Sequence, residues 1–175
     1  MDINSISLIK SSNSKSISYK FNEPCFEINE IIINLLVKVA GENKNKNCRF
    51  CFHSNSESLM QKMLIFERKK LYYPPHIHKN RDESHIVFHG SLELFILDNN
   101  GTVANRIVNS DRNKIISTVP PNFAHLTRPL TDYVIYLEIK NGPHKSFHED
   151  CFIPNPYNKK VLNEKEYSNY LDQFI

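Results

Sequence analysis

From residue 48 onward the chain consists of short runs in which apolar and polar residues alternate, a pattern typical of half-buried β-strands. No long helical pattern interrupts these runs before residue 140. Strands are predicted at 49–53, 61–68, 71–76, 83–89, 91–98, 103–108, 114–119, 125–127 and 133–139. Many short strands without intervening helices predict an all-β sandwich or a small barrel.

Three of the four glycines mark turns of this β region. Gly90 separates two predicted strands, and Asn100-Gly101 is typical of a two-residue hairpin turn. Gly142, between an asparagine and a proline, follows the last strand. The turn signals therefore agree with the strand pattern.

A helix is predicted before the β region and another after it. In the first, over 29–40, apolar residues recur with helical spacing, Asn29 can cap the start and Gly41 is expected to end it. The second is expected over 164–174, where an asparagine and a glutamate occupy capping-box positions.

The chain then divides into three parts. They are an arm and helix (1–47), a barrel (48–143) and a C-terminal extension (144–175).

Composition limits the partners that we expect. A formal net charge of +3 over 175 residues, with the basic residues scattered, does not indicate nucleic-acid binding. The longest apolar stretch, 28–40, is broken by polar residues, so no membrane span is predicted. The start at Met1-Asp2 lacks a secretory pattern, and we expect a cytoplasmic protein.

The cysteines are expected to be reduced thiols. Cys48 and Cys51 have CxxC spacing, but a strand there would direct them to opposite faces, and no second pair follows. Cys25 and Cys151 have no evident partner. Neither a zinc ribbon nor a redox pair is indicated.

The clearest candidate chemistry is a cluster of histidines and one carboxylate. His76 and His78 are two residues apart, so on one strand their side chains point the same way. Glu83 follows across a turn, and His125 lies further along the chain. Three imidazoles and a carboxylate predict a metal site with nitrogen and oxygen ligands.

The spacing matches two known sequence motifs. From its first histidine onward, the first cupin motif has a histidine, one residue, a second histidine, four residues, a glutamate, six residues and a glycine. This chain has His76, His78, Glu83 and Gly90 at those positions. The second cupin motif has a proline, one residue, a glycine, two residues and a histidine. This chain has Pro120, Asn122 and His125 there, with asparagine in place of the glycine. Asparagine tolerates left-handed backbone, so the turn can persist. Other motif positions depart, with Lys70, Lys114 and Pro129 in place of two glycines and an asparagine.

Residues 30–150 resemble the WbuC family of cupin-fold metalloproteins. The resemblance lies in Arg49…His53, Gln61-Lys62-Met63-Leu64, Tyr73-Pro74-Pro75-His76-Ile77-His78, Glu83-Ser84 and Asn141-Gly142-Pro143. It implies a cupin double-stranded β-helix, a jelly-roll barrel preceded by a short helical segment. It also implies His76, His78, Glu83 and His125 as ligands of a metal, and an association with surface polysaccharide (O-antigen) biosynthesis.

The ligand set suits one divalent ion, with iron, manganese, nickel and zinc all open. Four protein ligands would fill a tetrahedral zinc shell but leave two positions on a six-coordinate ion. The net positive charge of such a site favours an anionic or sugar-derived small molecule.

Strand alternation predicts further residues around the metal. Tyr72 should point the same way as the histidine pair, and His85 the same way as Glu83, so both are candidate catalytic residues. Arg49 and His53 would share a strand face and are candidate substrate-binding residues. A solvated position is expected for Glu138.

Several functions remain open at this stage. The first is a metal-dependent enzyme, an isomerase or epimerase, acting on a sugar or sugar nucleotide in polysaccharide synthesis. The others are an Fe(II)-dependent dioxygenase, a non-catalytic cupin that binds a small metabolite, and a metal-free ketoisomerase, which the intact ligand set disfavours. A homodimer is expected, because an apolar arm before the barrel could cover a neighbour's sheet edge.

Overall fold

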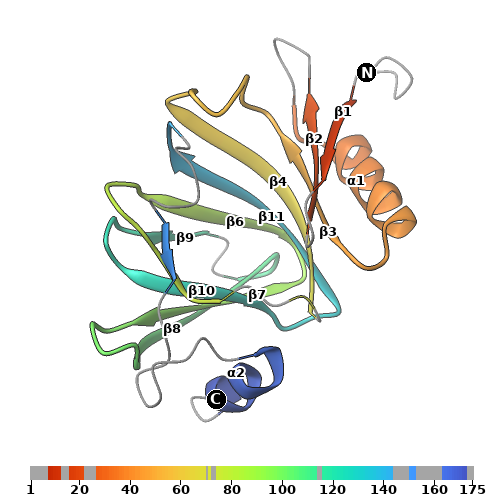
Figure 1. The fold of residues 1–175 in the computed structure, drawn as a ribbon. Coiled ribbons are helices and arrows are strands. Elements are labelled where there is room, and N and C mark those ends of the chain that lie inside the picture. The colour runs from red at the N-terminus through yellow and green to blue at the C-terminus, as the bar shows by residue number, and fades with distance from the viewer. Residues whose placement is uncertain are drawn as a thin grey trace.

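The computed structural model describes residues 8–12, 16–21, 27–69, 71, 74–113, 116–143, 150–152 and 163–172. Within them, two sheets face each other and a helix lies on the outside of each (Figure 1). Many neighbouring strands are distant in sequence, as in a jelly roll. The predicted all-β, double-stranded β-helix fold is confirmed.

The larger sheet has seven described strands. In spatial order they are β1 (Leu8–Ser12), β2 (Ser16–Phe21), β3 (Asn47–Cys51), β4 (Met60–Arg68), β11 (Tyr133–Asn141), β6 (Glu83–His89) and β9 (Ile116–Val119). Neighbours are antiparallel except β2 and β3, which run parallel. The N-terminal strands therefore extend the barrel sheet instead of forming a separate arm.

The smaller sheet has five described strands, all antiparallel to their neighbours. Their order is β12 (Asp150–Phe152), β5 (His76–His78), β10 (Ala124–Pro129), β7 (Ser91–Leu97) and β8 (Val103–Ser110). The predicted hairpin between β7 and β8 is present, but its turn is longer than the predicted two residues. The N–H of Asp98 donates to the carbonyl of Thr102, and Gly101, at φ +80°, donates its N–H to the carbonyl of Asp98.

The N-terminal helix, α1 (Glu30–Glu42), covers the outer face of the larger sheet around β2, β3 and β4. Asn29 caps it by accepting from two backbone N–H groups. Ile32 and Leu36 are fully buried against aromatic residues of the sheet. The sequence predicts an end at residue 40, before Gly41. A Cβ at Gly41 would meet nothing within 4 Å, and the helix ends two residues later than predicted, at Glu42.

The C-terminal helix, α2 (Glu164–Leu171), covers the outer face of the smaller sheet. Its predicted capping box is present, and Tyr170 and Leu171 pack on apolar side chains of β7 and β10. Beneath it lies a charge cluster, which we call the Glu93 cluster, consisting of Glu93, Arg106, Arg128 and Asp172. Fully buried Glu93 pairs with both arginines, and Arg128 continues to Asp172 of the helix C-cap at 2.8 Å.

One predicted strand is wrong. No strand runs over 71–76 in the described residues, and β5 begins only at His76. The physical reason is the pair Pro74-Pro75, because proline has no N–H to donate to a ladder. The strand expected at 49–53 also ends early, at Cys51.

Cys48 and Cys51 lie on opposite faces of β3, as predicted. Cys48 is buried in the core beneath α1, whereas Cys51 packs with apolar residues of the inner face. Neither forms a disulfide with another described residue. Cys25 lies outside the described residues, and only the backbone of Cys151 is described.

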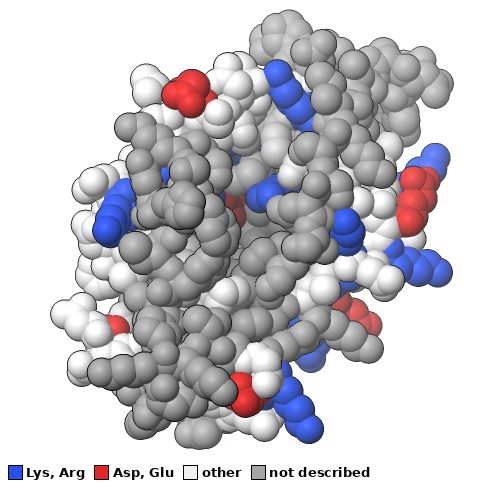
Figure 2. Space-filling model, in the orientation of Figure 1, with Lys and Arg blue, Asp and Glu red and all other residues white. Residues whose placement is uncertain are grey.

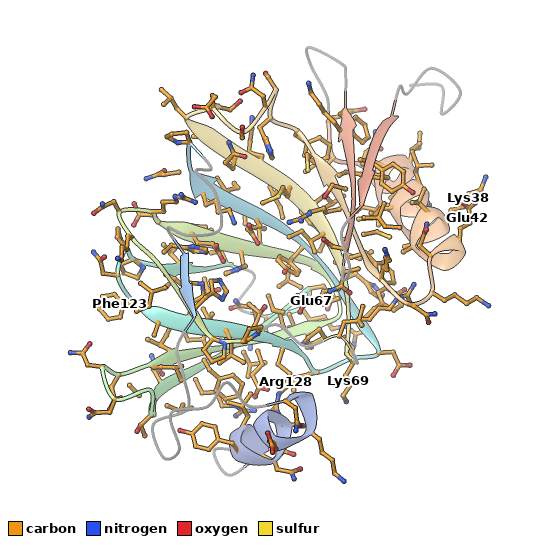
Figure 3. All side chains as sticks on the ribbon, viewed as in Figure 1. Lys38, Glu42, Glu67, Lys69, Phe123 and Arg128 are labelled. Atoms are coloured by element: carbon orange, nitrogen blue, oxygen red, sulfur yellow. The ribbon has the colours of Figure 1, made fainter. Side chains whose placement is uncertain are left out.

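Because side chains alternate between the two faces of each strand, the barrel interior contains both apolar and charged residues. Figure 3 shows Glu67 inside the barrel and Lys38 and Glu42 on the solvent side of α1. In the described part of the chain, no helix is both long and apolar enough to cross a membrane.

Candidate metal centre

Three histidines converge at one end of the barrel interior. His76 and His78 project from β5, and His125 stands opposite His76 on the neighbouring β10. Their ring centroids lie 4.5 Å apart for His76 and His125, 4.7 Å for His76 and His78, and 5.3 Å for His78 and His125. One ring nitrogen of each lies within 4.8 Å of the other two.

Backbone carbonyls fix the orientation of two of these rings. The Nδ1 of His76 lies 3.2 Å from the carbonyl of Pro74, and that of His125 lies 3.0 Å from the carbonyl of Phe123. An Nδ1–H that donates to a carbonyl leaves Nε2 as the lone-pair nitrogen, which is a common arrangement of metal-binding histidines.

A left-handed turn brings His125 into place. Asn122 has φ +66°, and its N–H donates to the carbonyl of His78 at 2.9 Å. The prediction that asparagine can hold this glycine position is confirmed. The turn therefore ties β10 to β5 next to the histidines.

Glu83 meets the histidines from the opposite sheet, at the start of β6. Its carboxylate lies 2.9 Å from Nε2 of His78, 2.8 Å from Nε2 of His85 and 3.5 Å from Nε2 of His125. Glu83, His85 and His125 are almost fully buried. All four predicted metal ligands are thus brought together.

Their protonation suits metal binding. Burial, with the charge of His125, lowers the pKa of His76 to about 3, so its ring is neutral at pH 7. Burial alone would raise the pKa of Glu83, but Lys140 and three imidazoles hold it well below its ordinary value. Neutral imidazoles and an ionised carboxylate are the forms that ligate metals.

The four residues fit a divalent cation. The buried Nε2 of His125 makes no hydrogen bond of good geometry within the described part of the chain. Leaving a buried acceptor in this state costs about 1–3 kcal/mol, and a bound cation would remove that cost. We therefore identify His76, His78, Glu83 and His125 as a candidate metal centre.

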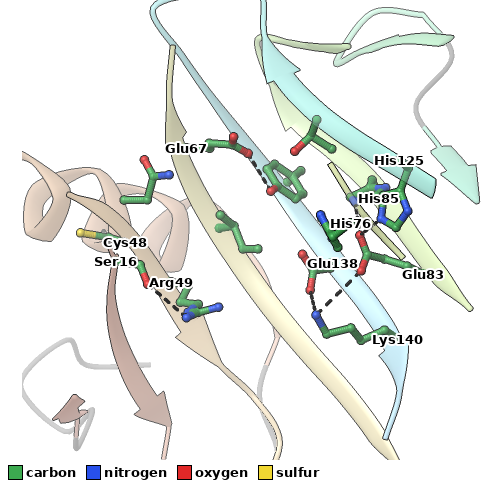
Figure 4. A pocket seen from close by; sticks show the side chains of 14 residues that line it. Ser16, Cys48, Arg49, Glu67, His76, Glu83, His85, His125, Glu138 and Lys140 are labelled. Atoms are coloured by element: carbon green, nitrogen blue, oxygen red, sulfur yellow. Dashed lines mark hydrogen bonds and ion pairs between the residues drawn. The ribbon is translucent and has the colours of Figure 1, made fainter. Parts of the chain in front are cut away.

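A larger cavity extends from this centre across the inner face of the seven-stranded sheet (Figure 4). It has about 680 Å³ of empty space. Its lining residues are Ser16, Asn47, Cys48, Arg49, Ile65, Glu67, His76, Glu83, His85, His125, Thr127, Tyr136, Glu138 and Lys140. Figure 2 shows acidic and basic side chains inside a hollow on one face of the molecule.

Alternate residues of β11 supply the second group of charges. Lys140 lies 2.8 Å from Glu138 and 3.8 Å from Glu83. Burial lowers the pKa of Lys140, but these two carboxylates outweigh that effect and raise it, so the ammonium stays charged. The expectation that Glu138 is solvated is wrong, because the side chain is buried and lines the cavity.

Glu67 and Tyr136 form a buried pair further along the cavity. The Tyr136 hydroxyl donates to Oε2 of Glu67 at 2.8 Å. Burial raises the pKa of Glu67 to about 7, although this bond and the charge of His85 act in the opposite direction and Glu138 adds to the rise. Burial and nearby carboxylates raise the pKa of Tyr136 well above its ordinary value. The carboxyl can therefore exchange a proton near neutral pH.

Of the other predicted site residues, two line the cavity and one does not. His85 lies in the cavity against Glu83, and Arg49 lines its far end. His53 is not among the lining residues. Its Nδ1 accepts from the N–H of Lys62, because β3 ends before residue 53 and the shared face with Arg49 is lost. Tyr72 lies outside the described residues.

Sequence reasoning missed Glu67, Tyr136 and Lys140. The available signal was polar residues at alternate positions of two apolar strands, Tyr136-x-Glu138-x-Lys140 in β11 and Glu67 in β4. The same alternation also fits a face exposed to solvent, so pairing of the strands was needed to show that it faces inward.

Comparison with known proteins gives a partial family match. The model of a family described as "Domain of unknown function (DUF6016)" matches residues 28–108, which is less than half of the chain. No curated protein matches.

Several solved structures resemble part of this chain. CapF is 13% identical over 59% of this chain, with a TM-score of 0.48, and a cupin superfamily protein from Desulfitobacterium hafniense is 12% identical over 55%, with 0.44. Oxalate decarboxylase from Bacillus subtilis, whose Mn(II) centres are described, is 18% identical over 65%, with 0.44. The matches cover 33%, 78% and 28% of those chains, so this chain spans about a third of CapF. At these identities the likeness concerns the fold alone.

Proposed function

We propose that the chain is a metal-binding cupin that holds one divalent ion with His76, His78, Glu83 and His125. The observation that carries this proposal is the convergence of three imidazoles and one carboxylate, from both sheets, in the barrel interior. Burial keeps the imidazole of His76 neutral, while Lys140 and hydrogen bonds from three imidazoles keep Glu83 ionised.

We propose further that the cavity binds a small molecule derived from a sugar, such as a sugar nucleotide used in surface polysaccharide synthesis. The support for this is the resemblance of residues 30–150 to the WbuC family. A bound divalent ion would supply Lewis acidity and lower the pKa of a bound water or hydroxyl.

The chain's own residues have distinct roles in this proposal. His85 holds the Glu83 carboxylate in place through its bond to Oε1. Glu67 holds or releases a proton near pH 7, with Tyr136 as its fixed donor. Tyr72 stays a predicted catalytic residue, and Lys140 keeps a positive charge beside Glu83.

Elemental analysis tests the metal. The protein should be purified without a metal-binding tag, together with His76→Ala and, as a matched control, His89→Ala, which removes an exposed histidine. The wild type and His89→Ala should contain about one divalent ion per chain, and His76→Ala should contain little. Equal metal content in all three proteins, or none in any, would contradict the proposal.

The identity of the metal separates the alternative reactions. Iron would bring forward the dioxygenase, whose oxygen consumption should disappear when zinc replaces iron. Manganese or nickel would favour isomerisation or epimerisation of a sugar. A cupin that only binds a metabolite would show tight binding and no turnover with any candidate sugar nucleotide.

A further inference from the structure

The far end of the cavity contains an arginine whose hydrogen-bond partners are neutral. Arg49 projects from β3, and its guanidinium donates to the hydroxyl of Ser18 at 2.7 Å and to that of Ser16 at 3.1 Å. Its third contact is the sulfur of Met63 at 3.9 Å. Among the residues that the structure describes, no carboxylate forms an ion pair with Arg49.

Arg49 differs in this respect from Arg106 and Arg128. Both of these arginines bind the carboxylate of Glu93. Arg68 also donates to neutral groups, two backbone carbonyls, but it is not among the residues that line the cavity. An arginine presents five N–H donors in a planar fork that suits a carboxylate or a phosphate, and neutral hydroxyls leave its charge uncompensated. Arg49 is therefore equipped to bind an anion that enters the cavity.

The N-terminal strand determines where this guanidinium points. Ser16 and Ser18 belong to β2, which pairs in parallel with β3 beside Arg49. Their hydroxyls hold the side chain at the edge of the cavity, and Figure 4 shows its head directed toward the region of Glu138 and Lys140.

The charges that line the cavity favour an anion once a metal is present. Lys140 is compensated by Glu138 and Glu83, while Arg49 has no carboxylate partner of its own in the described part of the chain. A divalent ion would add two positive charges to a site in which Glu83 is the one carboxylate ligand. Counting Arg49, Lys140 and the ion against all three lining carboxylates, Glu67, Glu83 and Glu138, positive charge then exceeds negative charge in the cavity as a whole.

We propose that the N-terminal strand completes an anion subsite at Arg49, so that the cavity takes a ligand with a metal-chelating head and a carboxylate or phosphate tail. This rests on the proposed metal centre for the head, whereas the tail is recognised by Arg49 alone. The geometry thereby assigns a role to β2, which precedes the predicted barrel segment in the sequence and extends its larger sheet.

Three probes with a common chelating head test the subsite. Lactate, malate and 3-phosphoglycerate all carry a 2-hydroxycarboxylate, but lactate has no anionic tail, malate has a carboxylate tail and 3-phosphoglycerate a phosphate tail. Their affinities should be measured by calorimetry on the metal-loaded, full-length protein. The variants are Arg49→Gln, Arg49→Lys, Ser18→Ala and, as the matched control, Arg112→Gln, which removes an exposed arginine outside the cavity.

In the wild type and Arg112→Gln, malate or 3-phosphoglycerate should bind about tenfold tighter than lactate, as expected for a charge-assisted hydrogen bond. Arg49→Gln should remove most of this preference while leaving lactate affinity and metal content unchanged. Arg49→Lys should keep part of it, and Ser18→Ala should weaken it less than Arg49→Gln. Whichever tail gives the larger preference identifies the anion.

Equal binding of the three probes, or a preference that survives Arg49→Gln in protein with unchanged metal content and thermal unfolding, would overturn the subsite. Failure of the metal centre gives a different result. If the wild type holds no metal, inorganic phosphate should still bind in a manner that Arg49→Gln weakens. Absence of that dependence would overturn the subsite independently of the metal.

Discussion

Two buried charge clusters in this protein differ in how completely their members are paired. In the Glu93 cluster, both carboxylate oxygens bind an arginine, and the network ends at Asp172 on the surface. Around Glu83, by contrast, three imidazoles and one ammonium share a single carboxylate. Two buried ring nitrogens there, Nε2 of His125 and Nδ1 of His85, make no hydrogen bond of good geometry within the described residues. The Glu93 cluster is complete without a ligand, whereas the Glu83 cluster is not.

The two clusters also occupy different places in the fold. Glu93 lies on the outer face of the smaller sheet beneath α2, where its ion pairs connect the helix to the sheet. Glu83 lies on the inner face of the larger sheet and lines the cavity. A fully paired buried network serves structure, and a network with unsatisfied buried atoms next to a cavity indicates a binding site.

The largest expected effect on stability comes from the complete cluster. Glu93→Gln should lower the free energy of unfolding by about 3–5 kcal/mol, because it leaves two arginines without their buried carboxylate. Asp172→Asn, which removes the exposed end of the same network, should cost less than about 1 kcal/mol. Urea unfolding of both variants measures the difference. Similar costs for the two would contradict a structural role for buried Glu93.

A second prediction concerns Glu67, another buried carboxyl of the cavity, and the dependence of stability on pH. The pKa of Glu67 is raised from 4.5 to about 7, so the folded state holds this proton more tightly than the unfolded chain. The stability that results is complete below about pH 4.5, is lost as pH rises to about 7, and is constant above that. Over this interval the wild type should lose about 3 kcal/mol relative to Glu67→Gln.

Urea unfolding from pH 4.5 to 8 tests this prediction, with Glu57→Gln as the control for loss of an exposed carboxyl. The other titratable groups are the same in the wild type and in Glu67→Gln, so their contribution cancels in the difference. A difference between wild type and Glu67→Gln that does not change with pH would show that the Glu67 carboxyl has an ordinary pKa.

The smallest effect concerns the turn that positions His125. Asn122 is exposed and has a positive φ, so Asn122→Ala removes no packing but places a Cβ residue in left-handed backbone. We expect a loss of about 1 kcal/mol, and Asn122→Gly should be as stable as the wild type or slightly more so. If thermal unfolding shows no difference between alanine and glycine, the turn is not under this constraint.

The sequence allowed prediction of the fold and of the four residues that converge at the candidate metal centre, because both depend on local spacing. His76 and His78 share a strand face by alternation, Glu83 follows at the motif distance, and Asn122 is the residue type that tolerates the required turn. Strand ends were less predictable. The pair Pro74-Pro75 delays β5, and the early end of β3 removes His53 from the face that Arg49 shares.

The remaining cavity residues could not be predicted because they depend on which strands become neighbours. Glu138 lies opposite His85 on β6 and opposite Met63 on β4, and both pairings join segments distant in sequence. Without that register, a glutamate at an alternating position is equally compatible with solvent. For the same reason, the approach of Ser16 and Ser18 to Arg49 required the parallel pairing of β2 with β3.

The most direct test of the metal centre is anomalous diffraction from crystals of the metal-loaded protein, recorded on both sides of the absorption edge of the metal found by elemental analysis. We predict one strong peak within bonding distance, about 2.0–2.2 Å for nitrogen and oxygen ligands, of His76, His78, Glu83 and His125. No peak should lie at the Glu93 cluster. A crystal with full metal content but no anomalous peak among these four residues would contradict the account.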